Sequence, residues 1–181
     1  MTETRTYPKR KSTRLTKYDY SQEGLYFVTL CTQGMVCLFG EVYEREMQLN
    51  EVGRMVEGWY SEIENKFKDI FCHDMVIMPN HMHFIVENIN CECVGADLCV
   101  CPDDAGEHAG SPLHLVIQWF KTMTTNEYIR GVKNGKWKSF DKRIWQRNYY
   151  EHIIRNQFVC NKIVDYINNN PSNWKNDKYY L

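Results

Sequence analysis

Residues 70–87, IFCHDMVIMPNHMHFIVE, contain two largely apolar runs that are separated by Pro79 and Asn80. Both runs are rich in β-branched and aromatic residues, which is the composition of β-strands. A proline followed by an asparagine interrupts such a run and is typical of a tight turn or a bulge. We therefore predict strands over residues 70–78 and 81–87 that pair in one sheet.

The rest of the chain supplies elements on both sides of this pair. Residues 25–30, LYFVTL, have strand composition, whereas residues 50–66 carry apolar side chains at helical spacing after the capping residue Asn50. We predict further helices over residues 111–130 and 156–170, the last one ended by Pro171. Strands are predicted over residues 140–145 and 42–43, and residues 149–153 are interpreted as a short strand or irregular chain.

This order of elements indicates the fold class. A β-α-β-β-α-β succession followed by a last helix is the order of a ferredoxin-like α+β sandwich. The chain has 181 residues, of which 43% are hydrophobic and 14% aromatic, which suits one domain with one core.

Composition also bounds the location. The sequence has no apolar run of about 18 residues, so we expect no membrane span, and residues 1–17 are too polar for a secretory signal. Eight cysteines in a chain of this kind indicate free thiols in a reducing compartment rather than a disulfide scaffold. We therefore expect a cytoplasmic protein.

Charge is segregated along the chain although the net charge is only −1. Residues 1–20 hold six basic and two acidic residues, and residues 121–155 hold nine basic and three acidic residues. Residues 40–107 reverse the balance, with fifteen acidic and four basic residues. Such segregation lets a chain present a basic face to a polyanion, although charged runs are also often merely solvated surface.

Two segments fall outside the predicted sandwich. Residues 1–20 are interpreted as a basic N-terminal segment, and residues 21–181 as the domain. Residues 88–111 lack helical periodicity and are interpreted as an acidic, cysteine-rich insertion in that domain. Four of its cysteines form two Cys-x-Cys pairs, a spacing that differs from the usual zinc-finger pattern, so free thiols are favoured over zinc; they are Cys91, Cys93, Cys99 and Cys101.

His81 and His83 are the sharpest candidates for chemistry. Residues i and i+2 of a strand point to the same face, so the two imidazoles project side by side while Met82 and Phe84 point to the other face. Two neighbouring imidazoles can share one divalent ion and leave positions open for another ligand and for substrate oxygens. The alternative is a pair of histidines without a ligand role.

Tyr166 and Asn170 form a second candidate pair, since they lie one turn apart on the predicted last helix. Tyr166 is a candidate nucleophile, and Asn170 can offer a carbonyl oxygen to the same metal. A phenol with a pKa near its usual value of about 10 is a poor nucleophile unless a metal polarises the phosphate that it attacks. The alternative is an aromatic residue at the edge of the core.

Residues 144–155 mix flat aromatic side chains with Arg147, His152 and Arg155. Such mixtures can stack bases and hold phosphates of single-stranded nucleic acid. A structural role for Trp145 and Tyr149 in the core is equally compatible with the sequence.

Taken together, these motifs resemble the REP-associated tyrosine transposases of the HUH superfamily. The resemblance spans residues 18–171, and the order of its motifs is more specific than any one of them. The matching stretches are residues 18–20 with 26–29, 78–83, 118–121, 145–152, and 165–167 with 170–171.

The resemblance implies a metal-dependent single-strand DNA endonuclease and strand transferase that acts at hairpins through a 5′-phosphotyrosine. It implies that His81, His83 and Asn170 hold Mg²⁺ or Mn²⁺, that Tyr166 attacks, and that the protein acts as a monomer or homodimer. The side chains that we expect to contact single-stranded or hairpin DNA are Arg10, Lys11, Arg14, Lys121, Arg143, Arg147, His152 and Arg155.

Two other functions remain open from the sequence. One is a catalytically silent regulator of the same fold that binds hairpins in DNA or RNA. The other is a metal-dependent hydrolase that uses water as its nucleophile, although few acidic residues flank the histidines.

Overall fold

A four-stranded antiparallel sheet is the centre of this computed structural model, which describes Tyr20 and residues 22–89 and 113–180. The strand order is β4-β5-β1-β6, and the strands β2 and β3 form a separate hairpin. The predicted α+β class and the β-α-β-β-α-β order are confirmed. In chain order the elements are β1 (Gly24–Cys31), η1 (Gln33–Met35), β2 (Gly40–Tyr43), β3 (Glu46–Leu49), α1 (Glu51–Ser61), α2 (Ile63–Lys66), β4 (Ile70–Met78), β5 (His81–Asn88), α3 (Leu113–Lys133), β6 (Tyr150–Ile154), α4 (Gln157–Asn169) and η2 (Pro171–Asn176).

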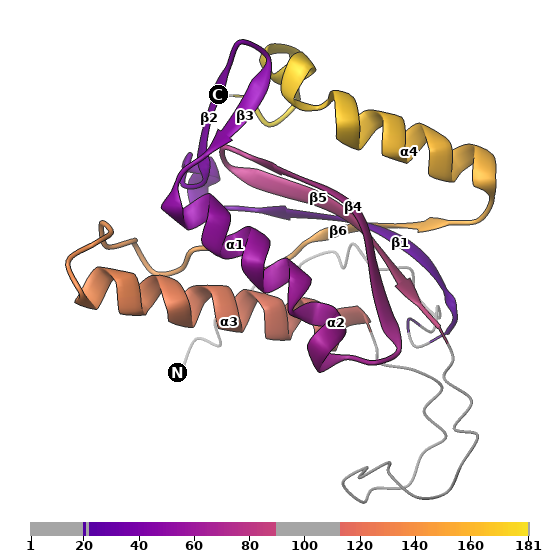
Figure 1. The fold of residues 1–181 in the computed structure, drawn as a ribbon, viewed down its shortest axis with the longest axis horizontal. Helices are drawn as coiled ribbons and strands as arrows, with labels where there is room; N and C mark the ends of the chain where they lie inside the picture. Colours follow the sequence, from indigo (N-terminus) through magenta and orange to yellow (C-terminus); the bar gives the residue numbers. More distant parts are fainter. Residues whose placement is uncertain (1–19, 21, 90–112, 181) are drawn as a thin grey trace, which may run out of the picture.

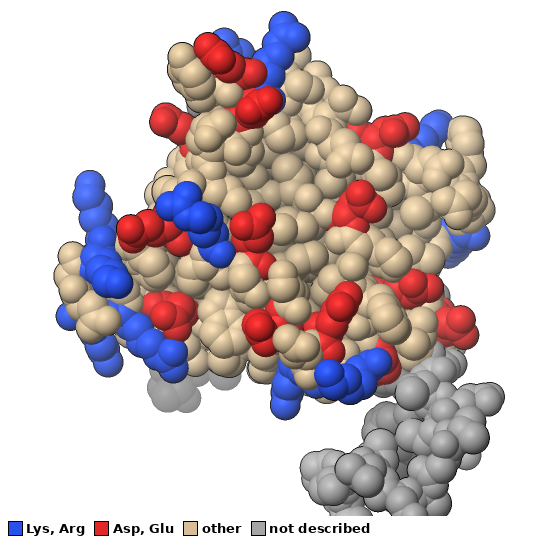
Figure 2. Space-filling model, viewed as in Figure 1, with Lys and Arg blue, Asp and Glu red and all other residues tan. Residues whose placement is uncertain are grey.

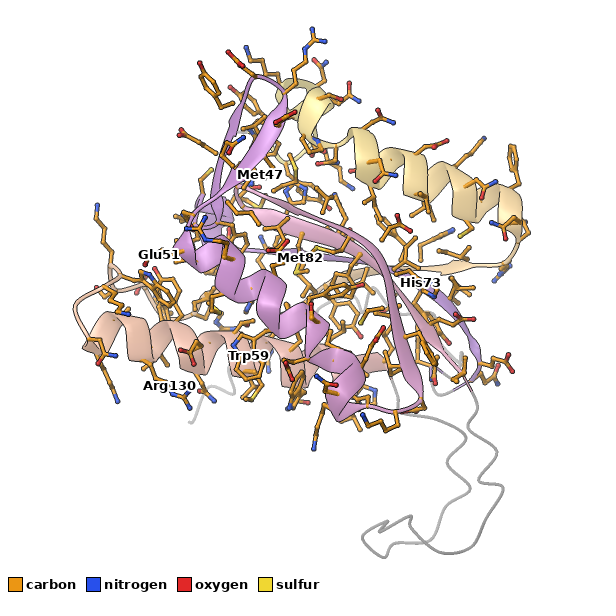
Figure 3. The ribbon with its side chains drawn as sticks, in the orientation of Figure 1. Met47, Glu51, Trp59, His73, Met82 and Arg130 are labelled. Carbon is orange, nitrogen blue, oxygen red and sulfur yellow. The ribbon has the colours of Figure 1, made fainter. Side chains whose placement is uncertain are left out.

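Helices cover both faces of the sheet (Figure 1). The helices α1 and α3 pack on one face, where the main core contains Tyr60, Phe84 and Phe120. Met82 points into the same core (Figure 3). The helix α4 lies on the opposite face, over a smaller cluster built from Ile85, Ile154 and Ile167.

Local sequence explains why α1 and α4 begin where they do. Asn50 accepts a hydrogen bond from the backbone nitrogen of Gly53 (2.9 Å), and Asn156 accepts one from that of Val159 (2.9 Å). Both are N-cap bonds, which satisfy a backbone donor that the first turn leaves unpaired. The helix predicted over residues 50–66 is therefore present, with a break at Glu62 between α1 and α2.

The strand predicted over residues 140–145 was wrong. Lys142 has a left-handed backbone (φ 62°), which interrupts an extended run, and only Trp145 forms a bridge, to Thr32. The backbone nitrogen of Gln146 donates to the carbonyl of Cys31 (2.9 Å), and the indole of Trp145 donates to Thr124 Oγ1 (2.9 Å) and packs on Phe39. The fourth strand of the sheet is β6, in the segment that the sequence left open.

The second strand of the β2–β3 hairpin, β3, was not predicted from the sequence. Residues 42–43 were predicted as a strand, but their partner Glu46–Leu49 was not. The two-residue turn consists of Glu44 and Arg45, both with positive φ, which is the conformation of a type I′ turn. Glutamate and arginine are not the residues that usually mark such a turn, so the turn cannot be recognised from the sequence.

Several predictions lie outside the described residues. They concern the N-terminal segment with Arg10, Lys11 and Arg14, and the insertion with its four cysteines.

Among the helices that are described, none has both the length and the apolar composition needed to cross a bilayer. On the face drawn in Figure 2, lysines and arginines gather over the C-terminal end of α3 and the loop after it.

We predict that docking of α4 depends on Ile167. Because this buried side chain packs on Ile85 and Ile154, replacement by alanine should lower the free energy of unfolding by about 2–4 kcal/mol. Urea denaturation followed by circular dichroism measures this loss. Phe158→Ala is the control on the same helix, since Phe158 is 68% exposed and should cost less than about 1 kcal/mol. Equal losses in the two variants would contradict this docking.

Candidate active site

The strand β5 places His81 and His83 on the face that α4 covers. His81 lies between Met78 and Cys31 in the sheet, and His83 lies between Val76 and Thr29. The two imidazole centroids are 4.6 Å apart, and the residues are only 0% and 1% exposed. The predicted side-by-side projection is therefore confirmed, with both rings buried.

Hydrogen bonds indicate the protonation of His81. The amide nitrogen of Asn80 donates to the carbonyls of Tyr179 (2.9 Å) and Met35 (3.3 Å), so its Oδ1 is an acceptor. That oxygen lies 2.8 Å from His81 Nδ1, which must then carry the proton. The lone pair of His81 is consequently on Nε2, which is buried and has no hydrogen-bond partner in the described part of the chain.

His83 links the sheet to α4. Its Nδ1 lies 2.7 Å from Thr29 Oγ1, and its Nε2 lies 3.1 Å from the hydroxyl of Tyr166. The ring also stacks on Phe27, with centroids 5.3 Å apart. These contacts fix the orientation of the imidazole.

Both imidazoles are held in the neutral form that a metal ligand requires. Burial lowers the pKa of His81 to about 4, against a smaller opposing effect of Asp177. Burial, together with the neighbouring His81, lowers the pKa of His83 well below its usual range.

The helix α4 brings Tyr166 and Asn170 to the histidines. Tyr166 is 39% exposed, and its ring meets that of His83 at a centroid distance of 5.1 Å. Asn170, at the end of the helix, is buried, and its Oδ1 has no hydrogen-bond partner among the residues that the structure describes. The four residues from β5 and α4 that the sequence singled out therefore belong to one site.

Asp177 is a member of the site that the sequence analysis missed. Its Oδ2 accepts hydrogen bonds from Asn170 Nδ2 (3.2 Å) and from the Tyr166 hydroxyl (3.4 Å). It lies after η2, in a segment without a motif, so only the folded chain identifies it. Burial raises the pKa of the Tyr166 hydroxyl to about 12, and the negative charge of Asp177 is the second cause of this rise.

The donor set fits a divalent cation. The candidate ligand atoms of His81, His83 and Asp177 lie within 4.8 Å of one another, the one such cluster among the described residues. The unpartnered His81 Nε2 and Asn170 Oδ1 are both buried atoms with unused lone pairs. Buried polar atoms normally have partners, and a mixed set of imidazole nitrogens and side-chain oxygens can coordinate a divalent cation.

Aromatic side chains from the C-terminal segment cover the histidines. The ring of Tyr179 lies 4.5 Å from that of His81 and 5.9 Å from that of His83, between centroids. Trp174 lies 5.9 Å from His81. A large ligand can therefore reach the two Nε2 atoms only if this segment moves.

The remaining candidate DNA contacts divide between two hollows. Lys121, Arg143 and Arg147 line a groove of about 630 Å³ between α3 and residues 143–149. The ammonium of Lys121 already donates to the carbonyls of Gln146 (2.9 Å) and Asn148 (3.4 Å), so it also holds this loop in place.

The second hollow lies beside β6. His152 and Arg155 line this pocket of about 420 Å³ together with Tyr20. The structure therefore brings together the predicted DNA contacts within each hollow, but it does not gather all five of them at one place.

Comparisons with known proteins show which sequences and solved structures this chain resembles. No family model matches the sequence. An uncharacterized protein of Haemophilus influenzae is 35% identical, over 95% of this chain and 93% of its own length. A solved REP-associated tyrosine transposase bound to a REP hairpin superposes with a TM-score of 0.55 and 19% identity, over 91% of this chain and 74% of the other. A protein from Deinococcus radiodurans R1, described as a candidate transposase, has 12% identity over 86% of this chain and 95% of its own, with a TM-score of 0.47.

We predict that His81 populates the tautomer protonated at Nδ1, because Asn80 offers an acceptor there. Long-range ¹H–¹⁵N correlation spectra of ¹⁵N-histidine-labelled protein measure this directly. Asn80→Ala should shift His81 toward the Nε2-protonated form, whereas His73→Ala should leave its signals in place. An Nε2-protonated His81 in the unmodified protein would contradict the assignment.

Proposed function

Because the chain belongs to one family with the uncharacterized Haemophilus influenzae protein and has the fold of a REP-associated tyrosine transposase, we propose that it is a metal-dependent single-strand DNA endonuclease and strand transferase. It acts at DNA hairpins through a 5′-phosphotyrosine on Tyr166. The observation that carries the proposal is the convergence of the Tyr166 hydroxyl on His83 Nε2, at 3.1 Å, beside the unpartnered Nε2 of His81.

His81 and His83 would hold the cation through their Nε2 atoms. Asn170 would supply an oxygen through Oδ1, and the Asp177 carboxylate would offer another within the same cluster. When bound, Mg²⁺ or Mn²⁺ polarises the scissile phosphate and stabilises the charge that develops on it. Thr29 keeps the His83 ring in its orientation, and Asn80 keeps His81 in the orientation and tautomer that this binding needs.

Tyr166 is the nucleophile of the proposed reaction. Its oxygen forms a bond to phosphorus, the bond from phosphorus to the 3′ oxygen breaks, and the strand leaves with a free 3′ hydroxyl. The proton lost by the phenol balances the one gained by the leaving oxygen, and the Asp177 carboxylate already accepts a hydrogen bond from that phenol. Attack by another 3′ hydroxyl reverses the step, so strand transfer needs no outside energy source.

DNA is held by basic side chains outside this centre. We propose that the exposed Arg143, Arg147, His152 and Arg155 contact phosphates, with Lys121 supporting the loop between the first two. The same role is proposed for Arg10, Lys11 and Arg14. One chain supplies the phenol and both imidazoles, so a monomer suffices for the reaction, and we expect it to act on cytoplasmic DNA.

We predict that Tyr166→Phe abolishes a covalent protein–DNA adduct, because the substituted ring lacks the attacking oxygen. The protein is incubated with Mn²⁺ and labelled hairpin oligonucleotides that carry single-stranded flanks, and the products are separated on a denaturing gel. Hairpin binding should be unchanged. Tyr43→Phe is the control, since Tyr43 is an exposed tyrosine on the β2–β3 hairpin.

Two results would overturn this assignment. An adduct formed by the Tyr166→Phe variant would place the nucleophile on another tyrosine. Tight, salt-sensitive hairpin binding by the unmodified protein with neither cleavage nor adduct would instead favour the silent binding module. Cleavage without an adduct would favour water as the nucleophile.

We also predict that Mn²⁺ binding, measured by isothermal titration calorimetry without DNA, depends on both histidines. His81→Ala and His83→Ala should each weaken it by about 100-fold or more, since loss of a residue that only orients a ligand costs about 10–100-fold. Asn170→Ala and Asp177→Asn are compared separately, and the larger loss identifies the main oxygen ligand. The control is His73→Ala, because His73 pairs with Glu87 outside the site. Unchanged binding in both histidine variants would exclude this metal site.

A further inference from the structure

The edge strand β6 continues the row of side chains that contains His83. Thr29 lies opposite His83 on β5 and opposite Tyr150 on β6. Side chains at directly paired positions of an antiparallel sheet point to the same face. Tyr150 therefore stands on the face of the candidate active site, two strand spacings, or about 10 Å, from His83.

Tyr150 is exposed although it is a large aromatic residue in a strand. It is 55% accessible, whereas the preceding residue, Tyr149, is buried in the main core. The next side chain on the same face of β6, His152, is also exposed. Tyr149 thus packs in the core, whereas the flat ring of Tyr150 remains at the surface beside the site.

A cation lies near this ring. The ammonium of Lys178 is 5.8 Å from the centroid of Tyr150 and 4.7 Å from that of Tyr179. Tyr179 covers the imidazoles, so Lys178 stands between the exposed ring and the candidate metal site. An aromatic surface next to a positive charge is the combination with which proteins hold single-stranded nucleic acid.

We propose that Tyr150 is a positioning residue that stacks a nucleobase of the single strand next to the scissile phosphate, while Lys178 neutralises an adjoining phosphate. The inference rests on the proposed function and deepens it. A base held on Tyr150 fixes the strand about two strand spacings from His83 and so places the phosphate in front of Tyr166. Because every base has a flat face, this contact is tolerant of sequence.

The test measures binding without chemistry. Fluorescence anisotropy compares a labelled oligothymidylate of about 12 nucleotides with an abasic strand of the same length and phosphate number, on the full chain carrying Tyr166→Phe. Adding Tyr150→Ala should weaken binding of the oligothymidylate by about 10-fold and leave binding of the abasic strand unchanged. Tyr150→Phe should restore it, and Tyr43→Ala is the control at another exposed tyrosine, which is 63% accessible.

The outcomes separate this inference from the proposed function. Equal binding of the oligothymidylate with and without Tyr150, or an equal loss on the abasic strand, overturns the stacking role. A loss confined to the strand with bases supports it, even where the unmodified protein forms no adduct. Thermal denaturation of the Tyr150→Ala variant, expected within a few degrees of its parent, excludes unfolding as the cause.

Discussion

Side chains of β5 alternate between the two faces of the sheet, and this alternation sets where the core and the candidate active site lie. Met82 and Phe84 fill the main core, so His81, His83 and Ile85 must face the other way. A slip of one residue in this strand would bury the imidazoles under α1 and α3 and turn the apolar set toward the face that α4 covers. The packing of the core therefore fixes which face can carry chemistry.

The helix α4 packs on the face that carries His81 and His83. The contacts that stabilise this helix therefore also set the geometry of the candidate active site. Ile85 follows His83 by two residues and packs on Ile167, which precedes the cap of α4 and lies next to Tyr166 in sequence. A helix seated by that contact has little freedom to move its tyrosine relative to the imidazoles. The small cluster on this face thus acts as the support of the candidate active site.

The sequence predicted most of what depends on local pattern, except β3 and its unusual turn, and missed what depends on distant contacts. The strands around Pro79 and Asn80 and the capped helices agree with the structure because alternation and capping are short-range effects. The segment that ends at Trp145 is held by its bond to Thr124 across the core, which no local pattern reveals.

Within the site, the same division applies. The His81–His83 and Tyr166–Asn170 pairs follow from the periods of a strand and a helix. Asp177 enters only because the turns after α4 fold back toward β5, and the cover made by Tyr179 has the same origin. Tyr150 gains its position from the register of β6 on β1, which the sequence left open.

Electron spin-echo spectroscopy of Mn²⁺ bound to the protein tests most directly whether the two imidazoles share one cation. If they do, the spectrum should show nitrogen couplings from two histidines, and these couplings should change on ¹⁵N-histidine labelling. In His81→Ala, couplings from one histidine should remain. A spectrum of Mn²⁺ with only oxygen neighbours, unchanged by that labelling, would contradict it.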